Sequence, residues 1–133
     1  MILVVDTANE ETFLGLWDKG WLSQIKWLAG RNLSADIMWK LEELFEKADK
    51  NFKETKGLIV NAGPGSFTGL RIGISIANIF AYSLNIPIVG LTKMKNSEQL
   101  LKSGNRLLKS KKYFEMPVRP TYGREPNITI SKK

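Results

Sequence analysis

The sequence contains neither cysteine nor histidine. Without cysteine the chain has no disulfide, no thiolate nucleophile and no cysteine metal ligand. Without histidine it also lacks the commonest general base and the commonest ligand of transition metals. Any chemistry that this chain performs alone must use carboxylates, hydroxyl groups, lysine or the backbone, and we expect neither a catalytic residue nor a metal site in it.

A signal peptide and a long apolar run are absent as well. The N-terminal stretch MILVVDTANEE has no basic segment ahead of its short apolar run, unlike a secretory signal. No apolar run reaches the roughly 18 residues that a membrane span needs. The sequence of 133 residues therefore predicts a cytoplasmic protein of one domain without a membrane partner.

Charge is balanced over residues 1–101, which hold 11 basic and 11 acidic residues, whereas residues 102–133 hold 9 basic and 2 acidic ones. The whole net charge of +7 thus lies in the C-terminal quarter. Such a segment either faces an acidic partner, RNA included, or is a solvated tail. The residues for which we expect RNA contacts are Arg106, Lys109, Lys111, Lys112, Arg119 and Arg124.

The hydrophobic pattern predicts alternating strands and helices. The expected strands are Ile2–Thr7, Thr12–Asp18, Gly20–Ala29, Gly57–Ala62 and Ile86–Leu91. The expected helices run from Ser34 as N-cap to about Lys50, from Ser66 to Leu84, and from Thr92 as cap to Ser103. After Gly104 the periodicity is weak, and proline and glycine punctuate the chain, which predicts an extended segment.

The resulting order, βββαβαβα, predicts an α/β protein with a mixed sheet and helices on its faces. The same order occurs in the ribonuclease-H-like fold of the actin and sugar-kinase (ASKHA) superfamily, which by itself says nothing about activity. We therefore expect an ASKHA-like N-terminal lobe over residues 1–103 and a basic, mostly extended tail over residues 104–133.

The predicted helix Ser66–Leu84 is apolar on more than one side, which is typical of a helix inside a large protein or at an interface. A short chain offers no deep interior, so we expect an interface shared with the helix that begins at Ser34. Burial of both stripes within this chain is the alternative. The expected interface residues are Ile37, Leu41, Leu44, Phe67, Arg71, Ile72, Ile76, Ile79 and Phe80.

A glycine-rich loop, NAGPGSFTGLRIGIS, precedes that helix. Its loop residues are Gly63, Pro64, Gly65, Ser66, Thr68 and Gly69. The P-loop pattern fails because Leu70 and Arg71 stand where Lys-Ser or Lys-Thr is needed. The dinucleotide pattern G-x-G-x-x-G fails because Thr68 takes the place of its last glycine. Binding of an anion by backbone N–H groups and Arg71 at the start of the helix is an alternative that these failures leave open.

Two side chains near this loop have alternative roles. Ser66 is expected to cap the helix, because no histidine is present to activate it as a nucleophile. Asp6 ends the first strand, where kinase-like folds direct a carboxylate toward a bound metal–nucleotide. It is equally an ordinary strand-end residue that caps a loop together with Thr7.

The run GPGSFTGLRIGIS and the opening ILVVDTA resemble the TsaB (YeaZ) family closely. The family signature Gly-Pro-Gly-Ser-[Phe/Tyr]-Thr-Gly-[Leu/Val]-Arg is matched throughout by residues 63–71, and the resemblance covers roughly residues 1–100. The stretch PVRPTYGREPNIT also resembles the family's closing segment. Where the family has a second lobe, only residues 104–115 stand here, so we expect no inter-lobe cleft and no cofactor bound by this chain alone.

The resemblance implies a non-catalytic scaffold and activator that pairs with TsaD during threonylcarbamoylation of adenosine 37 in tRNA (t6A37). It implies TsaE as a further partner, with ATP and metal on the partner subunits. Homodimers through the same helices are a second arrangement, and tRNA is contacted indirectly or through the basic tail. The alternative is a small nucleotide-binding or phosphotransferase protein of the actin-like superfamily. A peptidase activity lacks a nucleophile–base pair in this sequence.

Overall fold

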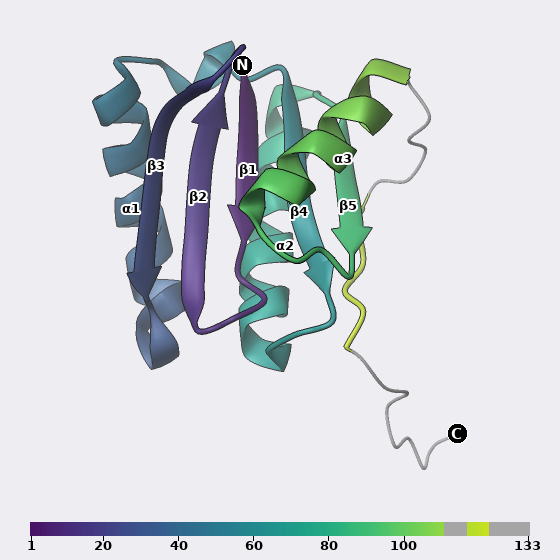
Figure 1. Cartoon of the computed structure of the whole chain (residues 1–133). Helices are drawn as coiled ribbons and strands as arrows, with labels where there is room; N and C mark the ends of the chain where they lie inside the picture. The colour runs from purple at the N-terminus through teal and green to yellow at the C-terminus, as the bar shows by residue number, and fades with distance from the viewer. Residues whose placement is uncertain (111–116, 123–133) are drawn as a thin grey trace.

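The computed structural model describes residues 1–110 and 117–122 and consists of a five-stranded mixed sheet with helices on both faces (Figure 1). This arrangement confirms the predicted α/β class. The strands are β1 (Ile2–Asp6), β2 (Glu11–Trp17), β3 (Trp21–Leu28), β4 (Gly57–Gly63) and β5 (Ile88–Thr92). The helices are α1 (Leu33–Ala48), α2 (Phe67–Leu84) and α3 (Ser97–Ser110), with short 3-10 turns η1 (Gly30–Asn32) and η2 (Phe52–Glu54).

The sheet has the spatial order β3-β2-β1-β4-β5. β1, β2 and β3 form an antiparallel meander, whereas β4 and β5 run parallel to β1. Parallel neighbours need a crossover connection, and α1 and α2 supply it on the same side of the sheet (Figure 1). A hairpin turn connects β2 to β3, the second and third predicted strands, and in it Lys19 has a positive φ of 63°.

Each face of the sheet has its own core cluster. The α1–α2 face buries the larger cluster, in which Leu3, Val5, Leu58 and Val60 from the central strands pack together with residues of both helices. The α3 face buries a smaller cluster, which consists of Val4, Phe13, Ile59, Val89, Leu100 and Leu101. The strands at the centre are therefore buried on both faces, which is why their sequences read as continuous apolar runs.

Two predicted helix starts are wrong. Ser34 is not the N-cap of α1, because the 3-10 turn η1 leads directly into a helix that begins at Leu33 with Asn32 as its cap residue. Thr92 does not start α3 but ends β5. Asn96 precedes α3, and its side chain accepts from the Gln99 N–H at 2.8 Å, which is the usual contact of an N-cap.

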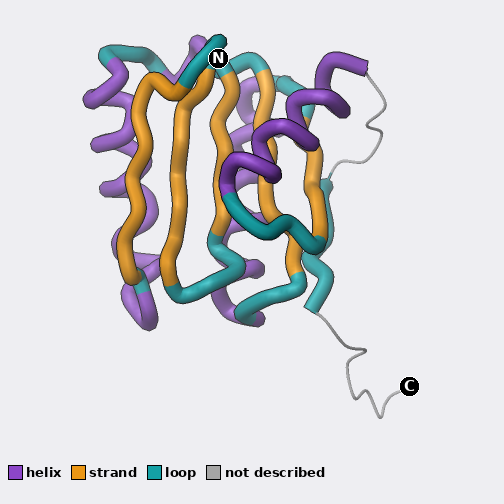
Figure 2. The backbone as a smooth tube through the Cα atoms, in the orientation of Figure 1, coloured by secondary structure: helices purple, strands orange, loops and turns teal. Residues whose placement is uncertain are grey.

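The expected extended segment after Gly104 is also wrong in its first part, because α3 continues to Ser110. Gly104 does not end the helix; it faces the sheet, where a Cβ would lie 2.6 Å from side-chain carbons of Ile59. Close packing thus explains this glycine. Residues 117–122 are described without helix or strand and run beside β5 (Figures 1 and 2).

By length and composition alone, α2 is apolar enough to cross a membrane, contrary to the expectation that no run in the sequence is long enough. A single such helix is weak indication of a membrane span, since core helices of soluble proteins meet the same criterion. In this fold α2 packs on the sheet, with Leu70, Ala77 and Ala81 completely buried.

Candidate partner-binding groove and glycine turn

The glycine loop is a turn that connects β4 to α2 and starts the helix. The Ser66 hydroxyl accepts from the Gly69 N–H at 3.1 Å, so the predicted N-cap is confirmed. The Ser66 N–H donates to the Ala8 carbonyl at 2.8 Å. The turn is therefore tied to the loop that follows β1, and the serine hydroxyl is engaged in capping.

The glycines permit close contact between that loop and α2. A side chain at Gly65 would meet the Ala8 carbonyl, and one at Gly69 would meet the Thr7 carbonyl. A side chain at Gly73 would meet the side chain of Thr7. The Thr7 hydroxyl also donates to the Gly69 carbonyl at 2.6 Å. These contacts give a packing reason for the glycines that the two phosphate-binding patterns do not.

Asp6 and Asn61 form a buried network that holds the start of the turn. The Asp6 Oδ1 accepts from the Ala8 N–H and from the Asn61 amide, both at 3.1 Å. The Asn61 Oδ1 in turn accepts from the Gly63 N–H at 2.9 Å. The loop-capping role that the sequence allowed for Asp6 is therefore observed. In residues 1–110 and 117–122 no group of three acidic side chains gathers as a metal-binding cluster.

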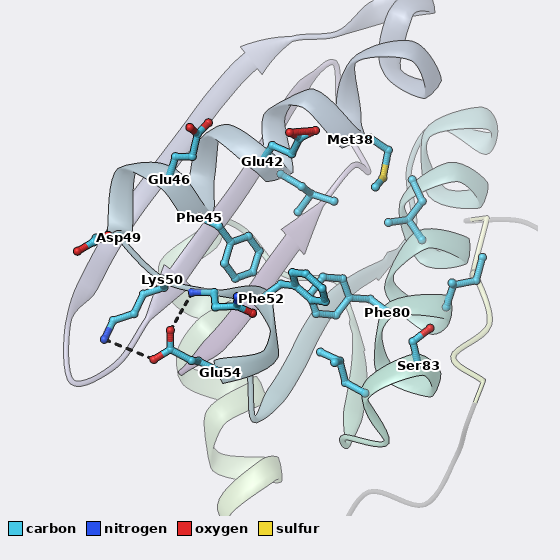
Figure 3. Close-up of a pocket in the computed structure, with 15 residues that line it drawn as sticks. Met38, Glu42, Phe45, Glu46, Asp49, Lys50, Phe52, Glu54, Phe80 and Ser83 are labelled. Carbon is cyan, nitrogen blue, oxygen red and sulfur yellow. Dashed lines mark hydrogen bonds and ion pairs between the residues drawn. The ribbon is translucent and has the colours of Figure 1, made fainter.

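An open groove of about 1080 Å³ lies between α1 and α2 (Figure 3). We call it the α1–α2 groove. Its centre is aromatic: the Phe80 ring lies 6.2 Å from that of Phe45, nearly parallel to it, and 6.2 Å from that of Phe52, in an edge contact. Apolar side chains of α2, Ile76 and Ile79, line it as well. The groove is thus an apolar surface that residues 1–110 and 117–122 leave uncovered.

The rim of the α1–α2 groove is mainly acidic. Glu42 and Glu46 of α1 border it, and so does Asp49 at the end of that helix (Figure 3). Lys50 is paired with Glu54 at 3.9 Å. Excess negative charge around an apolar centre favours a partner that presents basic residues around apolar ones.

The structure divides the predicted interface residues into two groups. Ile76, Ile79 and Phe80 line the groove. Ile37 and Leu44 are completely buried in this chain's own core, so the expectation that they face a partner is wrong for these two. They share a helical stripe with Leu41, which is buried and reaches the groove floor.

The remaining predicted interface residues lie at the first turns of α2. Arg71 stacks over the Phe67 ring at 5.4 Å, and Phe67 contacts the Tyr122 ring at 4.6 Å. Ile72 and Arg71 line a smaller hollow near the start of α1. The first turns of α2 therefore lie beside the groove and do not line it.

Phe45 and Phe52 are groove residues that were not predicted. Phe45 fits the helical period of α1. Its position among the apolar residues of that helix does not indicate that its ring reaches the groove. Phe52 lies in the short turn η2, for which the hydrophobic pattern predicts no element. Its signal is the capping box of Asn51 and Glu54. The Asn51 N–H donates to the Glu54 carboxylate, and the Asn51 side chain accepts from the Lys53 N–H, both at 2.8 Å.

The predicted RNA-contacting residues are only partly described. Arg106 and Lys109 are exposed on α3 and not in an extended tail, and Lys102 lies on the same side of this helix. Arg119 is exposed in the segment 117–122. Lys111, Lys112 and Arg124 lie outside the described residues. In the part of the chain that is described, Lys102, Arg106 and Lys109 form no ion pair.

Comparison with known proteins relates residues 27–105 to the family model described as TsaD, tRNA N6-adenosine threonylcarbamoyltransferase. The tRNA threonylcarbamoyladenosine biosynthesis protein TsaB of Escherichia coli is 31% identical over 98 residues, covering 74% of this chain and 42% of that protein. The Bacillus subtilis TsaB is 32% identical over 96 residues, covering 71% and 42%. The chain thus spans about two fifths of the length of these relatives.

A tRNA N6-adenosine threonylcarbamoyltransferase of Geotalea daltonii is 38% identical over 69 residues, which cover 52% of this chain and 20% of that enzyme. Among solved structures, YeaZ from Pseudomonas aeruginosa superimposes with a TM-score of 0.64 at 24% identity, covering 68% of this chain and 43% of that one. This structural likeness concerns the fold alone. It agrees with the mixed α/β sheet described above.

Proposed function

This chain belongs to the TsaD family, in its TsaB (YeaZ) branch, and from that premise we propose that it is a non-catalytic scaffold in tRNA threonylcarbamoyladenosine biosynthesis. In this proposal it pairs with a TsaD protein and activates it. The observation that carries the proposal is the open, apolar α1–α2 groove. An apolar groove of this kind on a small chain is typical of an interaction site.

The relationship between this chain and TsaD supports pairing through these helices. Residues 27–105, which match the TsaD family model, include α1, α2 and the groove between them. Two related chains with equivalent helices can pair as pseudo-symmetric halves, each covering the other's groove. We infer the same surface for a homodimer when TsaD is absent. TsaE, with the ATP and the metal that the partner subunits hold, completes the proposed assembly.

Absence of catalysis by this chain alone is part of the proposal. Ser66 is held as a helix cap, and Asp6 is bonded to Ala8 and Asn61. Neither histidine nor cysteine occurs in the sequence. The strand order β3-β2-β1-β4-β5 supports an actin-like, ribonuclease-H-like lobe. We also infer a cytoplasmic location, where tRNA is modified.

The basic side of α3 supports a second contact, with tRNA. Lys102, Arg106 and Lys109 recur at helical spacing and are exposed. The helix α3 that carries them lies on the opposite face of the sheet from α1 and α2 (Figure 1). We propose that a TsaD protein occupies the groove while α3 contacts RNA phosphates, because unpaired Lys and Arg side chains supply the salt-sensitive part of RNA binding.

Co-expression with the TsaD protein of the same genome tests the proposal. We expect the two chains to co-elute in size-exclusion chromatography and to reconstitute threonylcarbamoylation of tRNA when TsaE and threonylcarbamoyl-AMP are supplied. Separate elution of TsaD from the wild-type chain would contradict the scaffold role. Titration calorimetry with ATP and Mg²⁺ should give no binding heat for this chain alone; micromolar binding would favour the nucleotide-binding alternative.

A further inference from the structure

Part of the sheet on the α1–α2 face is covered by a segment and not by a helix. The segment 117–122 lies beside β5 (Figure 1). Its Val118 and Tyr122 pack against the core cluster of this face, which includes Ile88 of β5. The segment therefore covers apolar surface next to α2 although it has no secondary structure of its own.

One side chain of α2 binds the backbone of this segment at two points. The Asn78 amide nitrogen donates to the Val118 carbonyl at 3.0 Å. The Val118 N–H donates to the Asn78 amide oxygen at 2.9 Å. A primary amide reproduces in this way the donor–acceptor pair that a neighbouring strand would offer. The contact recognises an extended backbone whatever side chains it carries.

A free backbone carbonyl of the sheet supplies the next contact. The Thr121 N–H donates to the Ala62 carbonyl at 2.7 Å. Ala62 lies where the register between β4 and β5 shifts, between Asn61 and Gly63, so it has no paired residue in β5. An irregularity of this kind leaves backbone groups unpaired. Here it provides an acceptor for the segment.

Two glycines make room for the segment, and an aromatic contact closes its far end. A side chain at Gly90 would meet the side chain of Val118, and one at Gly63 would meet the Thr121 carbonyl. Beyond Thr121, the Tyr122 ring lies 4.6 Å from that of Phe67. Shape, backbone bonds and an aromatic contact thus converge on one stretch of chain.

We propose that Asn78, the Ala62 carbonyl, Gly90 and Phe67 form a peptide-binding site for one extended segment, which residues 117–122 occupy within the same chain. Its ligand class is an extended peptide with an apolar β-branched residue followed four positions later by an aromatic one. The occupant touches Gly63 and Phe67, so it braces both ends of the glycine turn. This inference does not rest on the proposed pairing with TsaD.

Amide hydrogen exchange on the full chain tests the contacts. In the Asn78→Ala variant we expect the Val118 and Thr121 N–H groups to exchange at least about 10-fold faster than in the wild type, because the two contacts are lost together. Tyr82→Ala is the matched control, one helical turn further along α2 and 81% exposed. Exchange should stay within about twofold of the wild type there. Unchanged exchange in Asn78→Ala would overturn the proposal.

A peptide supplied in trans tests the site itself. The full chain carrying Val118→Asp and Tyr122→Ala should bind a fluorescein-labelled peptide of sequence FEMPVRPTYGRE, measured by fluorescence anisotropy. The wild type, whose site is filled, should bind at least about 10-fold more weakly, and so should the double variant with Asn78→Ala added. Absence of binding by a double variant with wild-type circular dichroism overturns the proposal. Should that variant not fold, the exchange rates decide.

Discussion

The two faces of the sheet differ in how completely their helices are covered. On one face, α3 buries Leu100 and Leu101 and turns basic residues to the outside. On the other, α2 buries Leu70 and Ile74 against the sheet and still leaves Ile79 66% exposed. A helix with one apolar stripe is satisfied by one sheet, whereas a helix that is apolar all round needs a second partner. The apolar side of α3 is thus covered by the sheet, whereas α2 keeps apolar residues exposed that a partner can cover.

The largest effect is expected from substituting the glycines at which the two helices pack closely against neighbouring residues. Gly69→Ala on α2 would place a methyl group against the Thr7 backbone carbonyl, which cannot rotate away. We expect the free energy of unfolding to fall by about 3 kcal/mol. Gly104→Ala on α3 would place its methyl group against the side chain of Ile59, which can shift, and it gains helix propensity, so the loss should be about 1 kcal/mol. Urea denaturation measures both free energies of unfolding. Equal losses would show that the two helices tolerate an added methyl group equally well.

Substitution in the α1–α2 groove should separate pairing from folding. Ile79→Asp places a charge among the groove's apolar residues, and we expect affinity for TsaD to fall about 100-fold. Tyr82→Asp is the matched control on α2, because Tyr82 is exposed and does not line the groove. Both variants bear the same small helix-propensity cost, about 0.5 kcal/mol. Surface plasmon resonance measures affinity, and equal losses would exclude the groove as the pairing surface.

Charge reversal on α3 addresses the opposite face. The double variant Lys102→Glu with Arg106→Glu should retain tRNA about 10-fold more weakly at low salt, with the difference shrinking at high salt. Pairing with TsaD should be unchanged, since α3 lies across the sheet from the groove (Figure 1). Filter binding of tRNA to the assembled complex at two salt concentrations gives the measurement. An unchanged retention at low salt would leave α3 as a solvated face.

The starts of the two helices beside the groove provide the smallest test. Ser66→Ala removes the hydroxyl that caps α2, and we expect a loss of about 1 kcal/mol in the free energy of unfolding. Ser34→Ala should change it by less than about 0.5 kcal/mol, because Ser34 lies inside α1 and not at its cap. Thermal or urea unfolding compares the pair. A larger loss for Ser34→Ala would reverse the assignment of caps.

The strands and the helix α2 were predictable because local signals agree with the tertiary fold. β1 and β4 read as continuous apolar runs since both faces are buried. Ser66 follows a turn and precedes an apolar run, which is the ordinary pattern of a helix start. The family signature lies in this same stretch. Where the local sequence pattern and the tertiary packing agree, the structure can be predicted from the sequence.

The remaining features depend on contacts between distant residues. Gly104 resembles a helix terminator until Ile59 is placed beneath it. Val118 lies 40 positions from the Asn78 that binds it, and no local pattern reports such a contact. Ile37 and Phe45 occupy one helical stripe, yet Ile37 is completely buried and Phe45 lines the groove. Helical spacing predicts which side of a helix faces the core. It does not predict which residues on that side remain uncovered by the neighbouring element.

The packing of Thr7 against α2 has a consequence for how fast a partner binds. Thr7 fills the space beside Gly69 and Gly73 and bonds the Gly69 carbonyl, so we expect these contacts to resist rotation of α2 about its axis. We infer that a protein docking on Ile79 needs no rotation of α2 before it binds. We therefore expect association to be a single bimolecular step, with an observed rate that rises linearly with partner concentration and shows no plateau.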